Sequence, residues 1–124
     1  MAEKSLNILQ QGERLLDDLR SLILEARQDT ARSVNSTLVM LYWRVGQRIR
    51  KDILKEKRAS YGEQIFSTLS RKLVDEFGNG FSQQNLFRMV RFAEVFSKAQ
   101  IVATLSRQLG WSHFVEIIPL LQRI

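Results

Sequence analysis

One short polar segment carries the side chains of this chain best suited to contact a nucleic acid. Within it, Gln84, Arg88 and Arg91 are spaced so that they share one face of a helix. Amide and guanidinium groups hydrogen-bond base edges, and arginine also holds phosphates. The candidate DNA contacts are this face, its neighbours at the start of the helix and two basic residues on the preceding helix. They are Arg71, Lys72, Ser82, Gln83, Gln84, Asn85, Arg88 and Arg91.

The charge of the chain is placed unevenly. The net charge is +6, with five Lys/Arg against six Asp/Glu in residues 1–43 and fourteen against seven in residues 44–124. Seven of those fourteen bases lie within residues 44–58. A local positive potential favours a polyanion such as DNA. A solvated basic helix face has the same composition, so charge alone leaves both interpretations open.

Residues that could perform catalysis are scarce. The chain has one histidine, His113, and no cysteine, which excludes a histidine pair or a thiolate metal site within one chain. His113 stands beside an expected helix start, where hydrogen bonding or packing is its more common role. Metal-dependent nucleases pair carboxylates with an Asp/Glu-x-Lys element, and the sequence contains none. We therefore expect no enzymatic activity, no metal and no cofactor in this chain.

The sequence also predicts a location. The amino terminus lacks the basic-then-apolar layout of a signal peptide. The longest aliphatic and aromatic run, residues 38–43, is far too short to cross a bilayer. A cysteine-free chain suits a reducing compartment. We expect a cytoplasmic protein without a membrane partner.

The candidate contacts need helices to position them, and the sequence predicts one all-α helical domain over residues 1–124. There is a single proline, and no β-branched alternation of strand length occurs. A long amino-terminal helix is expected over residues 13–55. Its early apolar stripe is Leu15, Leu19, Leu22 and Ala26, and its later stripe is Ala31, Asn35, Leu38, Tyr42, Val45 and Ile49. The change of phase between the stripes predicts a break at residues 28–30.

Asn35 lies in the later stripe, whose heptad-like spacing suits a seam between helices. A buried asparagine can fix the register of a dimer or bundle contact. It can equally bond a nearby backbone group inside one domain. The spacing leaves the two alternatives open.

The remaining elements form a helix-turn-helix-like unit and two short helices. Residues 58–62 are expected to form a loop, followed by a helix to residue 77. Gly78 should end that helix and Ser82 should cap the next one. Two further helices are expected over residues 99–109 and 113–120, the last capped by Ser112.

Several of these residues, in this order and spacing, resemble the amino-terminal domain of the YhcG-like family of the PD-(D/E)xK nuclease superfamily. The most specific elements are Phe-Gly-Asn-Gly-Phe-Ser at residues 77–82 and Trp-Ser-His at residues 111–113. Also matching are Asn35, Leu41, Tyr42, Trp43, Gly46, Ile49, Tyr61, Gly62, Leu69, Ser70, Asn85, Leu86, Met89, Phe92 and Leu109. Gly110 departs from the pattern, because the family more often has serine there.

The resemblance implies a helical, non-catalytic DNA-binding domain that precedes a carboxy-terminal nuclease domain. The missing Asp/Glu-x-Lys element agrees with a chain that lacks this nuclease half. DNA and a second copy of the chain are the expected partners. The alternative is a helical oligomerisation or protein-docking module, built on the stripe through Asn35 and an aromatic cluster of Tyr42, Trp43, Phe87 and Trp111.

Overall fold

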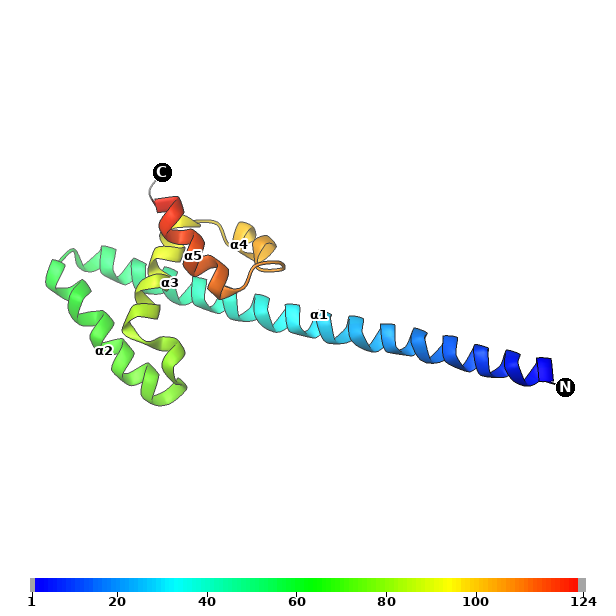
Figure 1. Ribbon diagram of the computed structural model, residues 1–124. Coiled ribbons are helices and arrows are strands. Elements are labelled where there is room, and N and C mark those ends of the chain that lie inside the picture. The colour runs from blue at the N-terminus through cyan, green and yellow to red at the C-terminus, as the bar shows by residue number, and fades with distance from the viewer. Residues whose placement is uncertain (1, 123–124) are drawn as a thin grey trace. The chain divides into compact units, whose positions relative to one another are not determined.

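The computed structural model describes residues 2–122, with the side chains of all of these except residues 2–9 and 59. All regular secondary structure in this part of the chain is helical, which confirms the all-α prediction (Figure 1). The elements are α1 (Ala2–Glu56), α2 (Ala59–Phe77), the 3-10 helix η1 (Asn79–Phe81), α3 (Gln83–Val95), α4 (Ala99–Leu105) and α5 (Trp111–Gln122). None of the helices within residues 2–122 is both long and apolar enough to span a membrane.

The first helix is longer than the sequence predicted and has no break. α1 runs through residues 28–30 without interruption, so the predicted break there is wrong. The phase of the apolar stripe changes, but no glycine or proline interrupts the backbone hydrogen bonds at these positions. Thr30 donates from Oγ1 to the carbonyl of Ala26 at 3.0 Å, a bond made within the helix. By their contacts, the residues divide into two units, Met1–Val34 and Asn35–Ile124.

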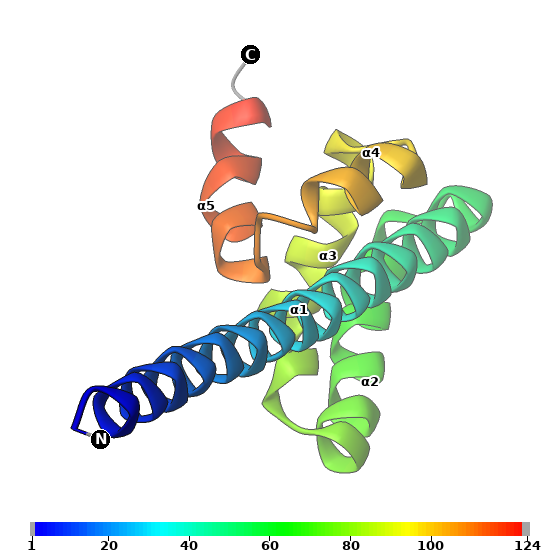
Figure 2. The same cartoon turned by 90° about the vertical axis from the view of Figure 1, so that its right-hand side faces the viewer.

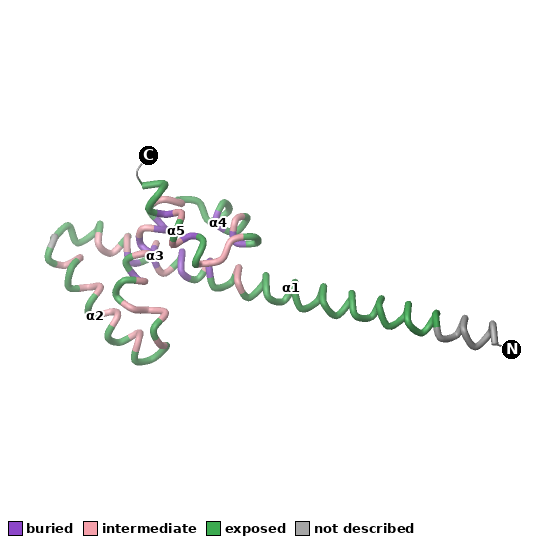
Figure 3. Tube along the Cα trace, in the orientation of Figure 1, coloured by how far each residue is buried: buried purple, intermediate pink, exposed green. Residues whose placement is uncertain are grey.

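The core of the second unit is built around α3. α3 packs against both α2 and α5 (Figure 2). Along the tube of Figure 3, the buried stretches of this unit gather in α3 and the segments beside it. One buried cluster comprises Val39, Trp43, Phe92, Ala93, Val102, Phe114 and Ile118. A second comprises Tyr42, Ile49, Leu86, Met89 and Val90. Because α3 contributes to both clusters, its buried face is fixed on two sides.

α1 and α3 approach each other closely at a glycine. A Cβ added to Gly46 would run into the backbone carbonyl of Met89. The side chain of Trp43 adds a second tie, since its Nε1 donates to the carbonyl of Phe96 at 2.6 Å. These contacts hold the orientation of α3 on the carboxy-terminal part of α1.

Asn35 forms its hydrogen bonds inside the chain. Its Nδ2 donates to the carbonyls of Ser106 and Leu109, each at 3.1 Å. Ser36 also donates to Ser106, at 2.9 Å. These bonds hold the connection between α4 and α5 against α1. The structure therefore shows the second of the two alternatives for Asn35, a bond to nearby backbone.

The turn between α1 and α2 is shorter than predicted. α2 begins at Ala59, so residues 59–62 are helical and the expected loop is wrong there. Lys57 makes the turn with a positive φ of 60°. Tyr61 donates its hydroxyl to the carboxylate of Asp52, which joins the two helices and raises the pKa of the tyrosine above its ordinary value. This tertiary bond supports the first turn of α2, where no side-chain cap exists.

Two other boundaries also differ from the sequence predictions. α4 ends at Leu105 instead of residue 109. α5 begins at Trp111, so Ser112 is inside the helix and does not cap it. The nitrogen Nδ1 of His113 instead accepts a hydrogen bond from the backbone N–H of Gly110 at 3.0 Å. His113 thus serves as a hydrogen-bonding residue at a helix start, as the sequence predicted.

Candidate nucleic-acid interface

The start of α3 is set by two local signals that the sequence showed. Gly78 ends α2 with a φ of 97°, and its N–H donates to the carbonyl of Val74. Ser82 precedes α3, and its side chain accepts from the backbone N–H of Asn85 at 3.2 Å. Both predictions are confirmed. The cap satisfies one of the free N–H groups of the first helical turn.

Asn85 links this turn to the first arginine of the candidate face. Its Nδ2 donates to the carbonyl of Gly80 at 3.2 Å. Its Oδ1 accepts from Arg88 at 3.3 Å. The half-buried side chain therefore uses both polar atoms within the protein. In this state Asn85 orients Arg88 and does not present a free amide.

The face formed by Gln84, Arg88 and Arg91 lies opposite the buried side of α3. Successive residues of a helix are separated by about 100°, which places these three side chains within about 60° of one another. Gln84 is exposed, whereas both arginines are half-buried. The guanidinium of Arg91 lies 4.7 Å from the centroid of the Phe87 ring, in cation–π geometry.

Neither Arg88 nor Arg91 has a carboxylate within ion-pair distance among the residues that the structure describes. Their positive charge is therefore available to an anion. Arg48 and Arg58 differ in this respect, because they pair with Asp52 at 3.8 Å and Glu56 at 3.2 Å. The basic segment 44–58 is thus partly neutralised by its own carboxylates.

Two hollows border the candidate face. The one toward α2 measures about 490 Å³ and is lined by Glu63, Phe66, Gln83, Gln84 and Phe87. The one toward α5 measures about 370 Å³ and is lined by Gln84, Phe87, Arg88, Arg91, Val115, Ile118, Pro119 and Gln122. Gln84 and Phe87 belong to both. The face is consequently a ridge between two grooves, with α2 and α5 as its walls.

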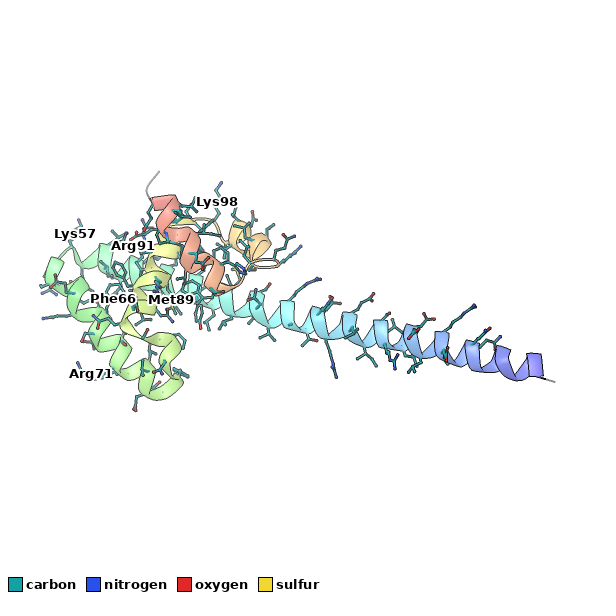
Figure 4. The ribbon with its side chains drawn as sticks, viewed as in Figure 1. Lys57, Phe66, Arg71, Met89, Arg91 and Lys98 are labelled. Carbon is teal, nitrogen blue, oxygen red and sulfur yellow. The ribbon has the colours of Figure 1, made fainter. Side chains whose placement is uncertain are left out.

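The structure brings six of the eight predicted residues together and leaves two apart. Arg71 and Lys72 are exposed on α2, the helix labelled with Arg71 in Figure 4. Phe66 marks the side of α2 that faces α3, because its ring lies 5.7 Å from that of Phe87. Arg71 follows Phe66 by five residues, which turns it about 140° away around the helix. Arg71 therefore does not share the surface of Arg88 and Arg91.

Sequence reasoning assigned Phe87 to an aromatic cluster and missed its place in this face. Tyr42 and Trp43 are buried in the core and Trp111 packs against it, but Phe87 is 45% exposed. Its position on the helical wheel, about 100° from Leu86, is a border between the buried and polar sides. Border aromatics of this kind can be identified from the wheel once the buried face is known. Glu63, the carboxylate at the edge of the face, was missed because it lies on another helix.

The described residues include no group of three His, Cys, Asp or Glu side chains that could hold a metal ion. What the arrangement offers is binding chemistry: two arginines, amides at a helix start and one exposed aromatic ring. These groups suit an anionic partner with planar bases. The fold and this face define an all-α domain with a polar, basic helix ridge.

Comparison with known proteins gives the family. The family model described as DUF1016 N-terminal domain matches residues 18–123, so the chain belongs to that family. It is also similar to the curated protein "Putative nuclease YhcG" of Escherichia coli (strain K12), with 35% identity over 98 residues. The aligned part is 78% of this chain and 26% of that protein. No solved structure matches.

These findings confirm the resemblance to the YhcG-like amino-terminal domain that the motifs at residues 77–82 and 111–113 indicated. The chain spans about a quarter of the length of the relative it matches. The similarity therefore concerns one amino-terminal domain of a longer protein.

Proposed function

We propose that this chain is a non-catalytic DNA-binding module that delivers a nuclease domain to its substrate in the cytoplasm. The observation that carries the proposal is the ridge of α3, where Arg88 and Arg91 lie one turn apart without a carboxylate partner among the described residues. Arginine in this setting can hold phosphates or hydrogen-bond guanine.

The start of α3 is the part of the ridge best suited to read bases. Gln83 and Gln84 are exposed in the first turn, where a recognition helix meets base edges. The free N–H groups of that turn also favour a phosphate. α2, η1 and α3 together resemble a helix-turn-helix, in which α3 would enter the major groove. Arg71 and Lys72 would contact only flanking phosphates, because they lie on the outer side of α2.

The relative supports the second half of the proposal. The Escherichia coli protein carries the name "Putative nuclease YhcG", and the chain matches about a quarter of its length. A binding module would complement a catalytic domain elsewhere in such a protein. The module would supply affinity and position, while the catalytic domain would supply hydrolysis.

The test is a fluorescence-anisotropy titration of a labelled duplex at low and moderate salt. We expect Arg88→Ala/Arg91→Ala to weaken binding by roughly 30-fold or more and to reduce the salt dependence, because each of the two lost contacts is worth about 1–3 kcal/mol. The control Arg14→Ala/Arg107→Ala removes the same charge from two exposed positions outside the ridge. It should change the affinity by no more than about twofold if the effect is local.

An equal loss in both double variants would reduce the effect to net charge and remove the assignment of α3 as the recognition helix. Thermal unfolding of each variant separates loss of contact from loss of structure. Unchanged DNA affinity in Arg88→Ala/Arg91→Ala would likewise remove the assignment of α3 as the recognition helix.

A second function is favoured by the exposed ring of Phe87 between the two hollows. An apolar anchor beside two hollows suits docking of a protein segment. In that case Phe87→Ala would abolish capture of the partner, and duplex DNA would not bind even at low salt.

A further inference from the structure

The first unit carries an apolar helix face that nothing in the proposed DNA-binding function uses. Between residues 10 and 30, α1 exposes five large apolar side chains on one side, each 47–61% accessible. These are Leu15, Leu16, Leu19, Leu22 and Ile23. With Ala26 they give three apolar positions per seven residues, a face too wide and regular for a solvated helix. We call the set of Leu15, Leu16, Leu19, Leu22, Ile23 and Ala26 the leucine face.

The spacing of the leucine face is that of a helix pair. Leu15, Leu19, Leu22 and Ala26 follow intervals of four, three and four residues, which keep side chains on the seam of a two-stranded coil. Leu16 and Ile23 widen the seam on one side. An isolated helix gains little from such a stripe, whereas a second helix laid against it removes the leucines from water.

The charges beside the leucine face identify the partner. One edge, next to Leu15 and Leu22, carries Asp18 and Glu25. The other edge, next to Leu16 and Ile23, carries Arg20 and Arg27. The face thus has an acidic border and a basic border at matching heights. A complementary partner places a basic border along the acidic one and an acidic border along the basic one. A second copy of this helix has both borders.

Orientation follows from the same borders. When two identical helices pair in parallel, opposite edges meet, so the acidic border of one copy lies along the basic border of the other. In an antiparallel pair like edges meet, and Asp18 and Glu25 would face their own equivalents. Arg20 currently pairs with Asp17 at 3.3 Å, but both side chains are largely exposed, so this contact can exchange for one across the seam.

We propose that two copies of this chain associate in parallel through the leucine face of α1. The stripe through Asn35, which the sequence suggested as a seam, is not needed, because Asn35 bonds Ser106 and Leu109 within its own chain. The inference does not depend on DNA binding and can fail or succeed without it.

The first test is the mass of the full chain in solution by light scattering at tens of micromolar, where one copy has a mass of 14.5 kDa. We expect the mass of a dimer, and Leu22→Glu should return it to that of one copy. The matched control is Leu24→Glu, which places the same charge on an equally exposed leucine outside the face. It should leave the dimer intact. A wild-type mass of one copy, or equal behaviour of the two variants, would overturn the proposal.

The second test fixes the orientation. The chain has no cysteine, so a single introduced cysteine can form a disulfide only with the same cysteine of a second copy. In a parallel pair, Leu15→Cys and Ala26→Cys should each form a disulfide with the same position of the second copy under mild oxidation. In an antiparallel pair no more than one of them can do so. Leu24→Cys is the control and should remain reduced. Efficient crosslinking at only one seam position would exclude the parallel arrangement.

Charge exchange tests the borders. Arg20→Glu/Arg27→Glu makes both borders acidic, and Asp18→Arg/Glu25→Arg makes both basic. Each variant alone should associate at least tenfold more weakly than the wild type at low salt. A mixture of the two should restore the dimer as a heterodimer. If mixing restores nothing, the ionic borders do not select the partner and the proposed pairing is wrong.

Discussion

At Gly46 the backbone of α1 lies directly against that of α3. A Cβ there would meet the carbonyl of Met89, and a backbone atom cannot rotate away as a flexible side chain can. This single position thus sets the distance between the helix that carries the candidate ridge and the helix that supports it. The absence of a side chain is a requirement of packing here.

The expected result for Gly46→Ala is a loss of at least about 2 kcal/mol of unfolding free energy, since overpacking of this kind costs about 1–3 kcal/mol and sometimes more. Urea unfolding followed by circular dichroism measures it. Gly62→Ala is the matched control, because this helical glycine has its nearest neighbour at 3.8 Å from an added Cβ. It should be neutral or stabilising by up to about 1 kcal/mol. Equal stability of the two variants would contradict the close approach.

Asn85 shows how a predicted contact residue can have a prior structural role. Its amide joins the carbonyl of Gly80 to the guanidinium of Arg88. The sequence placed Asn85 at the helix entry correctly, but could not show that both polar atoms would find partners in the chain. Arg88 is a local partner on α3 itself, whereas Gly80 belongs to the η1 turn, where Phe81 packs against Tyr42 with ring centroids 6.2 Å apart.

At the scale of elements, Asn35 joins the connection between α4 and α5 to α1. Its donor group serves two backbone carbonyls, of Ser106 and Leu109. Asn35→Asp keeps the shape but sets a carboxylate oxygen against those carbonyls. We expect a loss of about 2 kcal/mol or more, because two bonds are lost and the acceptors repel.

Thermal unfolding of Asn35→Asp checks this expectation. The same substitution at the exposed Asn79 changes the net charge equally and should cost less than about 0.5 kcal/mol. A variant at position 35 that unfolds like the control would mean that the amide does not hold the connection in place.

The elements also show which features local sequence could predict. Gly78 and Ser82 were predictable, because a helix end and a cap are decided by the residue itself and its near neighbours. The start of α2 was not, since the bond from Tyr61 to Asp52 joins two helices. Which side of α2 faces α3, and so whether Arg71 lies near the ridge, depends on tertiary packing. The stripe's phase change near residue 28 gave a false break because side-chain phase does not determine backbone continuity.

At the scale of the whole molecule, net charge is distributed unevenly along the sequence. Residues 1–43 hold five bases and six acids, and include the leucine face. Residues 44–124 hold fourteen bases and seven acids, and include the ridge of α3. An almost neutral segment is suited to self-association, because it can bring two copies together without bringing like net charges together. The basic remainder is suited to a polyanion.

If both proposals hold, association makes DNA binding bivalent. When one ridge of a dimer is bound to a duplex, the other ridge is held close to the same duplex. The effective concentration of this second ridge at the duplex is therefore raised. Leu22→Glu should then weaken binding to a long duplex by roughly tenfold or more, while binding to a duplex that accommodates one copy changes little. Leu24→Glu adds the same negative charge outside the leucine face and should not reproduce this loss on the long duplex. Anisotropy titrations on the two duplex lengths separate the cases. A loss of affinity by Leu22→Glu on both lengths would mean that the leucine face supports the fold of the binding unit. An equal loss of affinity by Leu24→Glu would reduce the effect to charge. Only a loss confined to the long duplex and to Leu22→Glu shows that the two surfaces act together.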